Sequence, residues 1–118
     1  MQKETVFIDE KKLNEIIINY YTNDDSEVIS VDKELIKIHG DLRLTLFLIK
    51  DDQRFIITYE DLEYVLKYYL HYLGYEFINY KFVGGIHNAG YYFDEDTPHF
   101  DGVSVTYRNH EKTKKLVP

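Results

Sequence analysis

Residues 58–74, TYEDLEYVLKYYLHYLG, form the stretch that decides the fold. Thr58 is a residue type that caps helix N-termini, and Asp61 three positions later completes an acidic capping box. Gly74 is placed to end the helix, because glycine readily adopts the left-handed conformation found there. The apolar residues in between recur with helical spacing and share one face: Leu62, Val65, Leu66, Tyr69, Leu70 and Leu73. The stretch therefore predicts an amphipathic helix over residues 59–73.

A second helix is predicted over residues 10–21. Asp9 is its expected N-cap, and Ile8 and Leu13 stand on either side of the cap at the positions of a hydrophobic staple. The short apolar run at residues 6–8 is interpreted as a lead-in to this helix. A polar turn cluster at residues 23–26 is expected to follow its end.

Much of the remaining chain alternates with a period of two, which is typical of β-strands. Asp32 and Lys33 interrupt one such run and predict a turn between two short strands. Phe47 and Ile49 add apolar residues to the second face of another run, so the end of that strand is expected to be covered on both sides. Strands are predicted at residues 27–31, 34–39, 42–49, 54–57, 76–83 and 103–108.

The order of these elements gives the α+β class. It runs from a helix through four strands to a second helix, and then to two or three further strands. We expect a single α+β domain over residues 1–118, with a mostly antiparallel sheet of five to seven strands. The helix over residues 59–73 is expected to pack on this sheet, with the N-terminal helix alongside.

The 118-residue chain carries 21 acidic and 14 basic residues, for a net charge of −7. Binding to a nucleic-acid backbone needs clustered lysine and arginine, so no direct nucleic-acid binding is expected. An acidic surface instead favours a basic protein partner, or imitates nucleic acid toward a protein that binds it. The alternative interpretation is that the charge only keeps a small protein dispersed.

Composition also excludes several classes of protein. The chain has no cysteine, which excludes disulfides, thiol catalysis and thiolate zinc sites. No phosphate-binding glycine loop or nucleophile elbow is present to support catalysis. No apolar run approaches the length of a membrane span, and the N-terminus has no signal-peptide pattern. We therefore expect a soluble cytoplasmic protein without a membrane partner.

Residues 84–102 are predicted to form a long irregular loop, and such loops often carry function. A fold-back of the loop would bring its histidines onto one divalent ion such as zinc, with aspartates completing the set. The candidate ligands are His87, His99, Asp94, Asp96 and Asp101. Their spacing matches no specific metal motif. A solvated acidic loop, whose histidines cap turns, is the alternative.

A tyrosine stripe runs along the predicted helix over residues 59–73. Tyr64, Tyr68 and Tyr72 recur at every fourth position, rotated from the leucine face. If exposed, they form an aromatic face of the kind enriched at interface hot spots. If the helix lies deep between the sheet and the first helix, the same tyrosines belong to the core. The sequence leaves both interpretations open.

In its length, excess of acid, lack of cysteine and twelve tyrosines, the chain resembles small acidic phage-encoded inhibitors of bacterial defence, anti-CRISPR proteins among them. The resemblance implies a non-enzymatic inhibitor in the bacterial host cytoplasm that binds a nuclease or another basic nucleic-acid-binding protein. The resemblance assigns no residue roles; from the acidic loop and the tyrosine stripe, the candidate partner-binding residues are Asp94, Glu95, Asp96, Asp101, Tyr64, Tyr68 and Tyr72. A second hypothesis is a metal-binding domain or small metal-dependent enzyme centred on residues 84–102. A third is a subunit that completes its core as a homo-oligomer.

Overall fold

The computed structural model describes residues 3–23, 28–38, 41–84 and 99–109. The elements are β1 (Lys3–Asp9), α1 (Glu10–Tyr21), β2 (Ile29–Ile38), β3 (Asp41–Lys50), β4 (Gln53–Ile57), α2 (Tyr59–Tyr72), β5 (Tyr75–Gly84) and β6 (Phe100–Asn109). The predicted α+β class and both predicted helices are confirmed. The part of the chain described by these four ranges holds six strands, within the predicted five to seven.

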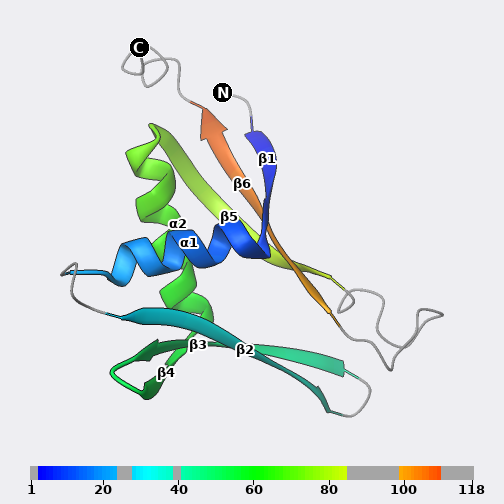
Figure 1. Ribbon diagram of the computed structural model, residues 1–118. Coiled ribbons are helices and arrows are strands. Elements are labelled where there is room, and N and C mark those ends of the chain that lie inside the picture. Colours follow the sequence, from blue (N-terminus) through cyan, green and yellow to red (C-terminus); the bar gives the residue numbers. More distant parts are fainter. Residues whose placement is uncertain (1–2, 24–27, 39–40, 85–98, 110–118) are drawn as a thin grey trace.

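The strands form two antiparallel sheets of three strands each, where the sequence predicted one sheet. Sheet A has the order β1-β6-β5 and sheet B the order β2-β3-β4. Figure 1 shows α1 crossing α2 in the space between the two sheets. Helix α1 contacts β1 and β6 of sheet A and β2 of sheet B, whereas α2 contacts β5 and β4. The expectation of one sheet is therefore wrong, because the helices separate the strands into two layers.

A single cluster of buried side chains joins both sheets to both helices. Burial of these apolar groups away from water is the main force that holds the layers together. The cluster takes residues from every element except β2, which contributes half-buried side chains at its margin. Its members are Ile8, Leu13, Ile16, Ile17, Leu46, Leu48, Ile57, Leu62, Val65, Leu66, Leu70, Tyr80, Phe100, Val103 and Val105.

Both helices begin at the caps that the sequence predicts. The Asp9 carboxylate accepts a hydrogen bond of 2.8 Å from the backbone N–H of Lys12. At α2, the Thr58 hydroxyl accepts from the backbone N–H of Asp61, and the Asp61 carboxylate accepts from the backbone N–H of Thr58, both at 3.0 Å. Gly74 follows the helix with a φ of 89°. In the described ranges, no helix has the length and apolar character needed to cross a bilayer.

Strand β1 was not predicted as a strand. It pairs antiparallel with β6 along its whole length, from Lys3 opposite Arg108 to Asp9 opposite Gly102. The two strands approach so closely at Gly102 that an added Cβ would overlap the carbonyl oxygen of Ile8, and the φ there is 149°. Glycine is therefore required at this position. The prediction of a lead-in was wrong because the pairing partner lies near the opposite end of the sequence.

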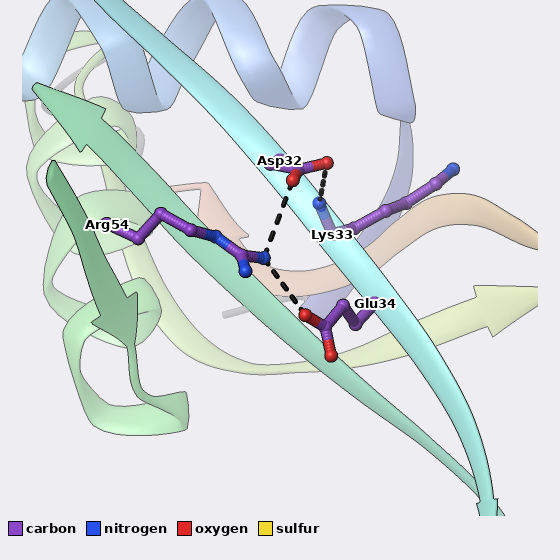
Figure 2. Close-up of polar contacts among 4 residues, drawn as sticks. All are labelled: Asp32, Lys33, Glu34 and Arg54. Carbon is purple, nitrogen blue, oxygen red and sulfur yellow. Dashed lines mark hydrogen bonds and ion pairs between the residues drawn. The ribbon is translucent and has the colours of Figure 1, made fainter. Parts of the chain in front are cut away.

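Strand β2 is continuous where the sequence predicted a turn at Asp32 and Lys33. Figure 2 shows Arg54 of β4 reaching across β3, with its Nη2 3.5 Å from Asp32 Oδ2 and 3.1 Å from Glu34 Oε1. Lys33 pairs with Glu10 of α1. These charged residues find partners on other elements, so the ladder with β3 continues through them. The predicted interruption is therefore wrong.

The end of β3 was predicted to be covered on both faces, and at Phe47 the covering group is the side chain of Arg54. The guanidinium carbon of Arg54 lies 3.8 Å from the centre of the Phe47 ring. An arginine stacked on an aromatic face gains a cation–π attraction and shields the ring from water. A side chain of the adjacent strand β4 thus half-buries the ring, while the opposite face of β3 packs Leu46 and Leu48 into the core.

Candidate protein-binding site

Tyr64, Tyr68 and Tyr72 lie on the exposed side of α2. Their exposed fractions are 61%, 58% and 80%, so the interpretation that placed them in the core is wrong. The reason is that α1 and β5 pack mainly on the opposite side of the helix, where Leu66 and its neighbours are buried. We call these three side chains the tyrosine ridge.

Neighbouring side chains hold the ridge in place. The Tyr68 ring packs edge-to-face against Tyr20 of α1, with ring centres 5.4 Å apart. Tyr20 packs in the same manner against Tyr21 at 5.0 Å. The ammonium group of Lys67 lies 5.6 Å from the centre of the Tyr64 ring. Aromatic rings restrained in this way lose less conformational entropy when a partner covers them.

Two concave regions flank the ridge. One is a groove of about 620 Å³ between α1 and α2, lined by Lys12, Glu15, Asn19, Tyr20, Tyr68 and Tyr72 among others. The other, of about 480 Å³, lies toward β5 and is lined by Lys67, Tyr68, His71, Tyr75, Glu76 and Phe77. Tyr68 lines both, so the ridge separates them. Both regions are open to solvent, so they suit protruding side chains of a partner protein rather than an enclosed small ligand.

The α1 side of the groove was not predicted from the sequence. Lys12, Glu15 and Asn19 recur at three- and four-residue spacing, which is the signal that places them on one helix side. Tyr20 of α1 is half-buried and also lines the groove. That α1 and α2 meet with these sides adjacent depends on tertiary packing.

Ion pairs border the ridge. They are partly exposed, so each contributes little to the free energy of folding. Their effect is to balance charge locally, which leaves the aromatic rings as the main contact surface. The pairs are Lys12 with Glu15 at 4.0 Å, Lys67 with Glu63 at 3.2 Å, and Arg108 with Glu76 at 3.1 Å.

A reciprocal pair of tyrosines fixes the start of α2 against β5. The Tyr59 hydroxyl donates to the carbonyl oxygen of Tyr80 at 2.7 Å, and the Tyr80 hydroxyl donates to the carbonyl oxygen of Tyr59 at 2.8 Å. The two rings stack with centres 4.3 Å apart. Burial, with smaller contributions from Tyr59 and Glu63, raises the pKa of the Tyr80 hydroxyl, so it stays protonated and able to donate.

Burial also raises the pKa of Tyr21, which stands beside the ridge, and the nearby Asp61 and Tyr20 add to the shift. Desolvation and negative neighbours both disfavour the phenolate. The neutral ring therefore supports Tyr20 and, through it, Tyr68.

Only two of the predicted metal ligands fall in the described ranges. His99 Nε2 lies 3.6 Å from Asp101 Oδ2, and both side chains are about half exposed. Strand β6 already begins before Asp101, so this residue lies in a strand and the predicted loop is shorter at this end. Within the described ranges, no group of three or more potential ligands is placed to hold a metal ion. The residues His87, Asp94, Glu95 and Asp96 lie outside the described residues.

Asp101 and the tyrosine ridge, predicted to share one partner surface, lie toward different ends of sheet A. The ladder places Tyr75, just after α2, opposite Asn109, whereas Gly84 at the far end of β5 lies opposite Phe100 beside Asp101. Eight residues of strand separate Asp101 from Asn109, or about 26 Å at ~3.3 Å per residue. The candidate site is therefore centred on the ridge and its two concave regions, at a distance from Asp101.

No protein-family model matches the chain, and no curated protein or solved structure is similar to it at a significant level.

Proposed function

We propose that this protein binds another protein through the tyrosine ridge and the groove between α1 and α2. We further propose that the partner is a basic nucleic-acid-binding protein, such as a nuclease of bacterial defence, and that binding inhibits it. The observation that carries the proposal is the exposure of Tyr64, Tyr68 and Tyr72 on successive turns of one helix.

Tyrosine suits such a role because its ring supplies a large contact area at a small entropy cost, while its hydroxyl stays hydrated until a partner arrives. Interface hot spots are enriched in tyrosine and lie next to pockets that receive side chains of the partner. Tyr68 meets both conditions, since it projects between two concave regions and is held by Tyr20.

The net charge of −7 supports the choice of partner class. A negative protein attracts positive surfaces during diffusion, and the attraction weakens as salt increases. Proteins that bind nucleic acid carry such positive surfaces. In this proposal the net charge speeds association and the tyrosines supply the contact area. Asp94, Glu95, Asp96 and Asp101 remain predicted contributors to the partner surface.

The test is affinity capture from bacterial lysate with three tagged proteins. They are the wild type, a ridge variant with Tyr64→Ala, Tyr68→Ala and Tyr72→Ala, and a control variant with Phe55→Thr and Ile56→Thr. The control removes exposed apolar side chains from β4, a strand of sheet B that lines neither concave region, and threonine suits a strand. Capture is run at about 50 mM and about 500 mM salt, since screening over this range separates charge-assisted binding from apolar binding.

We expect the wild type and the control to capture a basic protein that the ridge variant does not capture. The wild type and the control should capture less of it at high salt than at low salt. The captured protein is then purified, and its nucleic-acid binding or cleavage is measured with and without the wild type. Inhibition by the wild type and not by the ridge variant supports the proposal. Undiminished capture of every partner by the ridge variant would contradict it.

A further inference from the structure

The two sheets have four edge strands in the described part of the chain, and β1 differs from the other three. An edge strand presents unpaired backbone N–H and C=O groups that can pair with another strand. Strand β4 has only five residues, and β2 carries a charged segment whose side chains pair with α1 and β4. Strand β5 is covered on one face by α2.

Strand β1 has seven residues, and those from Lys3 to Phe7 are exposed. Val6 and Phe7 are 38% and 52% exposed and point to opposite faces of the sheet. In Figure 1, β1 forms one side of sheet A, and α1 leaves its end to cross between the two sheets. Among the described residues, no strand pairs with the outer edge of β1, which carries apolar side chains on both faces.

The sequence of β1, KETVFID, is complementary to itself in the antiparallel direction at five of its seven positions, the exceptions being Glu4 and Ile8, which face each other. When two copies pair about Val6, Lys3 of one faces Asp9 of the other at both ends of the ladder. Phe7 then faces Thr5, and the two Val6 side chains face each other. Opposite charges and aromatic–β-branched pairs directly across an antiparallel ladder are favourable combinations.

We infer that β1 is a self-association surface, at which a second copy of this chain adds its own β1 antiparallel with Val6 at the centre of symmetry. Sheet A then continues across the two copies as a six-stranded sheet, since each copy supplies β1, β6 and β5. This is a symmetric interface, in which the same residues are used on both sides.

The dimer leaves the tyrosine ridge uncovered. Helix α2 packs on β5, the strand at the opposite edge of sheet A from β1. Each dimer would therefore present two ridges, which would strengthen binding to a partner that offers two sites. The inference on β1 is independent of the proposed function and stands or fails separately from it.

A single strand-to-strand edge buries less surface than the ~1,200–2,000 Å² typical of stable complexes. The dimer is therefore reversible, and its dissociation constant falls in the micromolar range. Sedimentation equilibrium of the wild type from about 5 to about 500 µM should show a mass that rises from one to two copies, because this range brackets such an affinity.

The register is tested by cysteine cross-linking, for which the cysteine-free chain offers a clean background. Val6→Cys places two thiols directly across the ladder, where Cβ atoms are about 4.5–5.5 Å apart. Glu4→Cys is the matched control, because in this register its two copies lie four residues apart, or about 13 Å. We expect Val6→Cys to form a covalent dimer under mild oxidation at least tenfold faster than Glu4→Cys.

Charge variants give a second measurement that does not depend on cysteine. In the Lys3→Glu variant, the new carboxylate of each copy faces Asp9 of the other copy, so like charges meet at two symmetric positions. The dissociation constant of the dimer should rise roughly tenfold. Adding Asp9→Asn removes the repulsion while keeping a good helix cap, so the double variant should regain part of the lost affinity. Circular dichroism checks that each variant is folded.

A wild type that remains monomeric across the concentration range overturns the inference. A dimer whose Val6→Cys and Glu4→Cys variants cross-link at equal rates overturns the assignment to this register of β1. Loss of dimer formation in the Phe55→Thr/Ile56→Thr variant, with Lys3→Glu unaffected, would assign self-association to β4 instead.

Discussion

The two sides of helix α2 carry large apolar side chains in similar number and have opposite environments. On one side Leu62, Val65, Leu66 and Leu70 are almost completely buried under α1 and β5. On the other, the three tyrosines of the ridge remain mostly exposed. Buried leucine contributes its apolar surface to the stability of the fold itself. Exposed tyrosine keeps its apolar surface available to a partner, at little cost because its hydroxyl is hydrated.

The largest expected effect is on the buried side of α2. Leu66→Ala removes a side chain that is 0% exposed and leaves a cavity, so the free energy of unfolding should fall by about 2–5 kcal/mol. Urea denaturation followed by circular dichroism measures the change. A loss below about 1 kcal/mol would mean that the core around Leu66 collapses to fill the space or is less closely packed.

A smaller effect is expected where α2 is anchored to β5. Tyr80→Phe removes the hydroxyl that donates to the Tyr59 carbonyl and should cost about 1–2 kcal/mol. Tyr59→Phe, which removes the reciprocal donor from a more exposed ring, is the control and should cost less. We expect the larger cost at Tyr80 because its ring is more buried. Equal decreases in the free energy of unfolding for the two variants would contradict this explanation.

The same substitution should alter stability at alkaline pH. Folding raises the pKa of Tyr80 above its ordinary value of 10.0, so the folded state disfavours the phenolate. The stabilisation linked to the protonated form is complete below pH 10 and is lost as pH rises toward the folded pKa. Urea midpoints measured from pH 8 to pH 11 should therefore decline less steeply in Tyr80→Phe than in the wild type.

The cap of α2 belongs to neither side and gives an effect of intermediate size. Thr58→Ala removes the hydroxyl that accepts from the Asp61 N–H and should cost about 1 kcal/mol. Thr58→Ser keeps the acceptor and should stay within a few tenths of a kcal/mol of the wild type. A similar loss in both variants would show that the Thr58 methyl group, and not the cap, is responsible.

The smallest effect on stability is expected at the ridge. Tyr72 is 80% exposed, so Tyr72→Ala should change the free energy of unfolding by no more than about 0.5 kcal/mol. The same urea titration as for Leu66→Ala makes the two values comparable. A loss comparable to that of Leu66→Ala would mean that the ridge is part of the folding core.

Local patterns predicted the helices well. The caps at Asp9 and Thr58 and the glycine after α2 act through hydrogen bonds or backbone conformations within a few residues, so the sequence contains the whole signal. The turn at Asp51 and Asp52 belongs to the same kind, with both residues at positive φ between β3 and β4. Such features do not depend on the rest of the chain.

Strand β1 and the middle of β2 depend on distant partners. Thr5 lies opposite Thr106, and Asp32 is held by Arg54, so neither pairing is visible in a local window. The local pattern at Asp32 and Lys33 is that of a turn, and only the charges supplied by other elements make a continuous strand favourable there.

The sequence predicted which tyrosines form the candidate site, but not that they lie on the exposed side of α2. The spacing of Tyr64, Tyr68 and Tyr72 placed them on one side of a helix, because helical geometry alone determines which residues share a side. Which side faces water was decided by where α1 and β5 pack, and the groove exists only because α1 crosses beside that side.

The sequence by itself determined where the helices begin and end, most of the segments that favour strands, the negative charge and the tyrosine stripe, since these follow from near neighbours and composition. Only the tertiary structure decided that the strands form two sheets, that β1 is an exposed edge and that the ridge faces outward. The physical reason is that burial is shared among residues from the whole chain, and the core can cover only one side of α2.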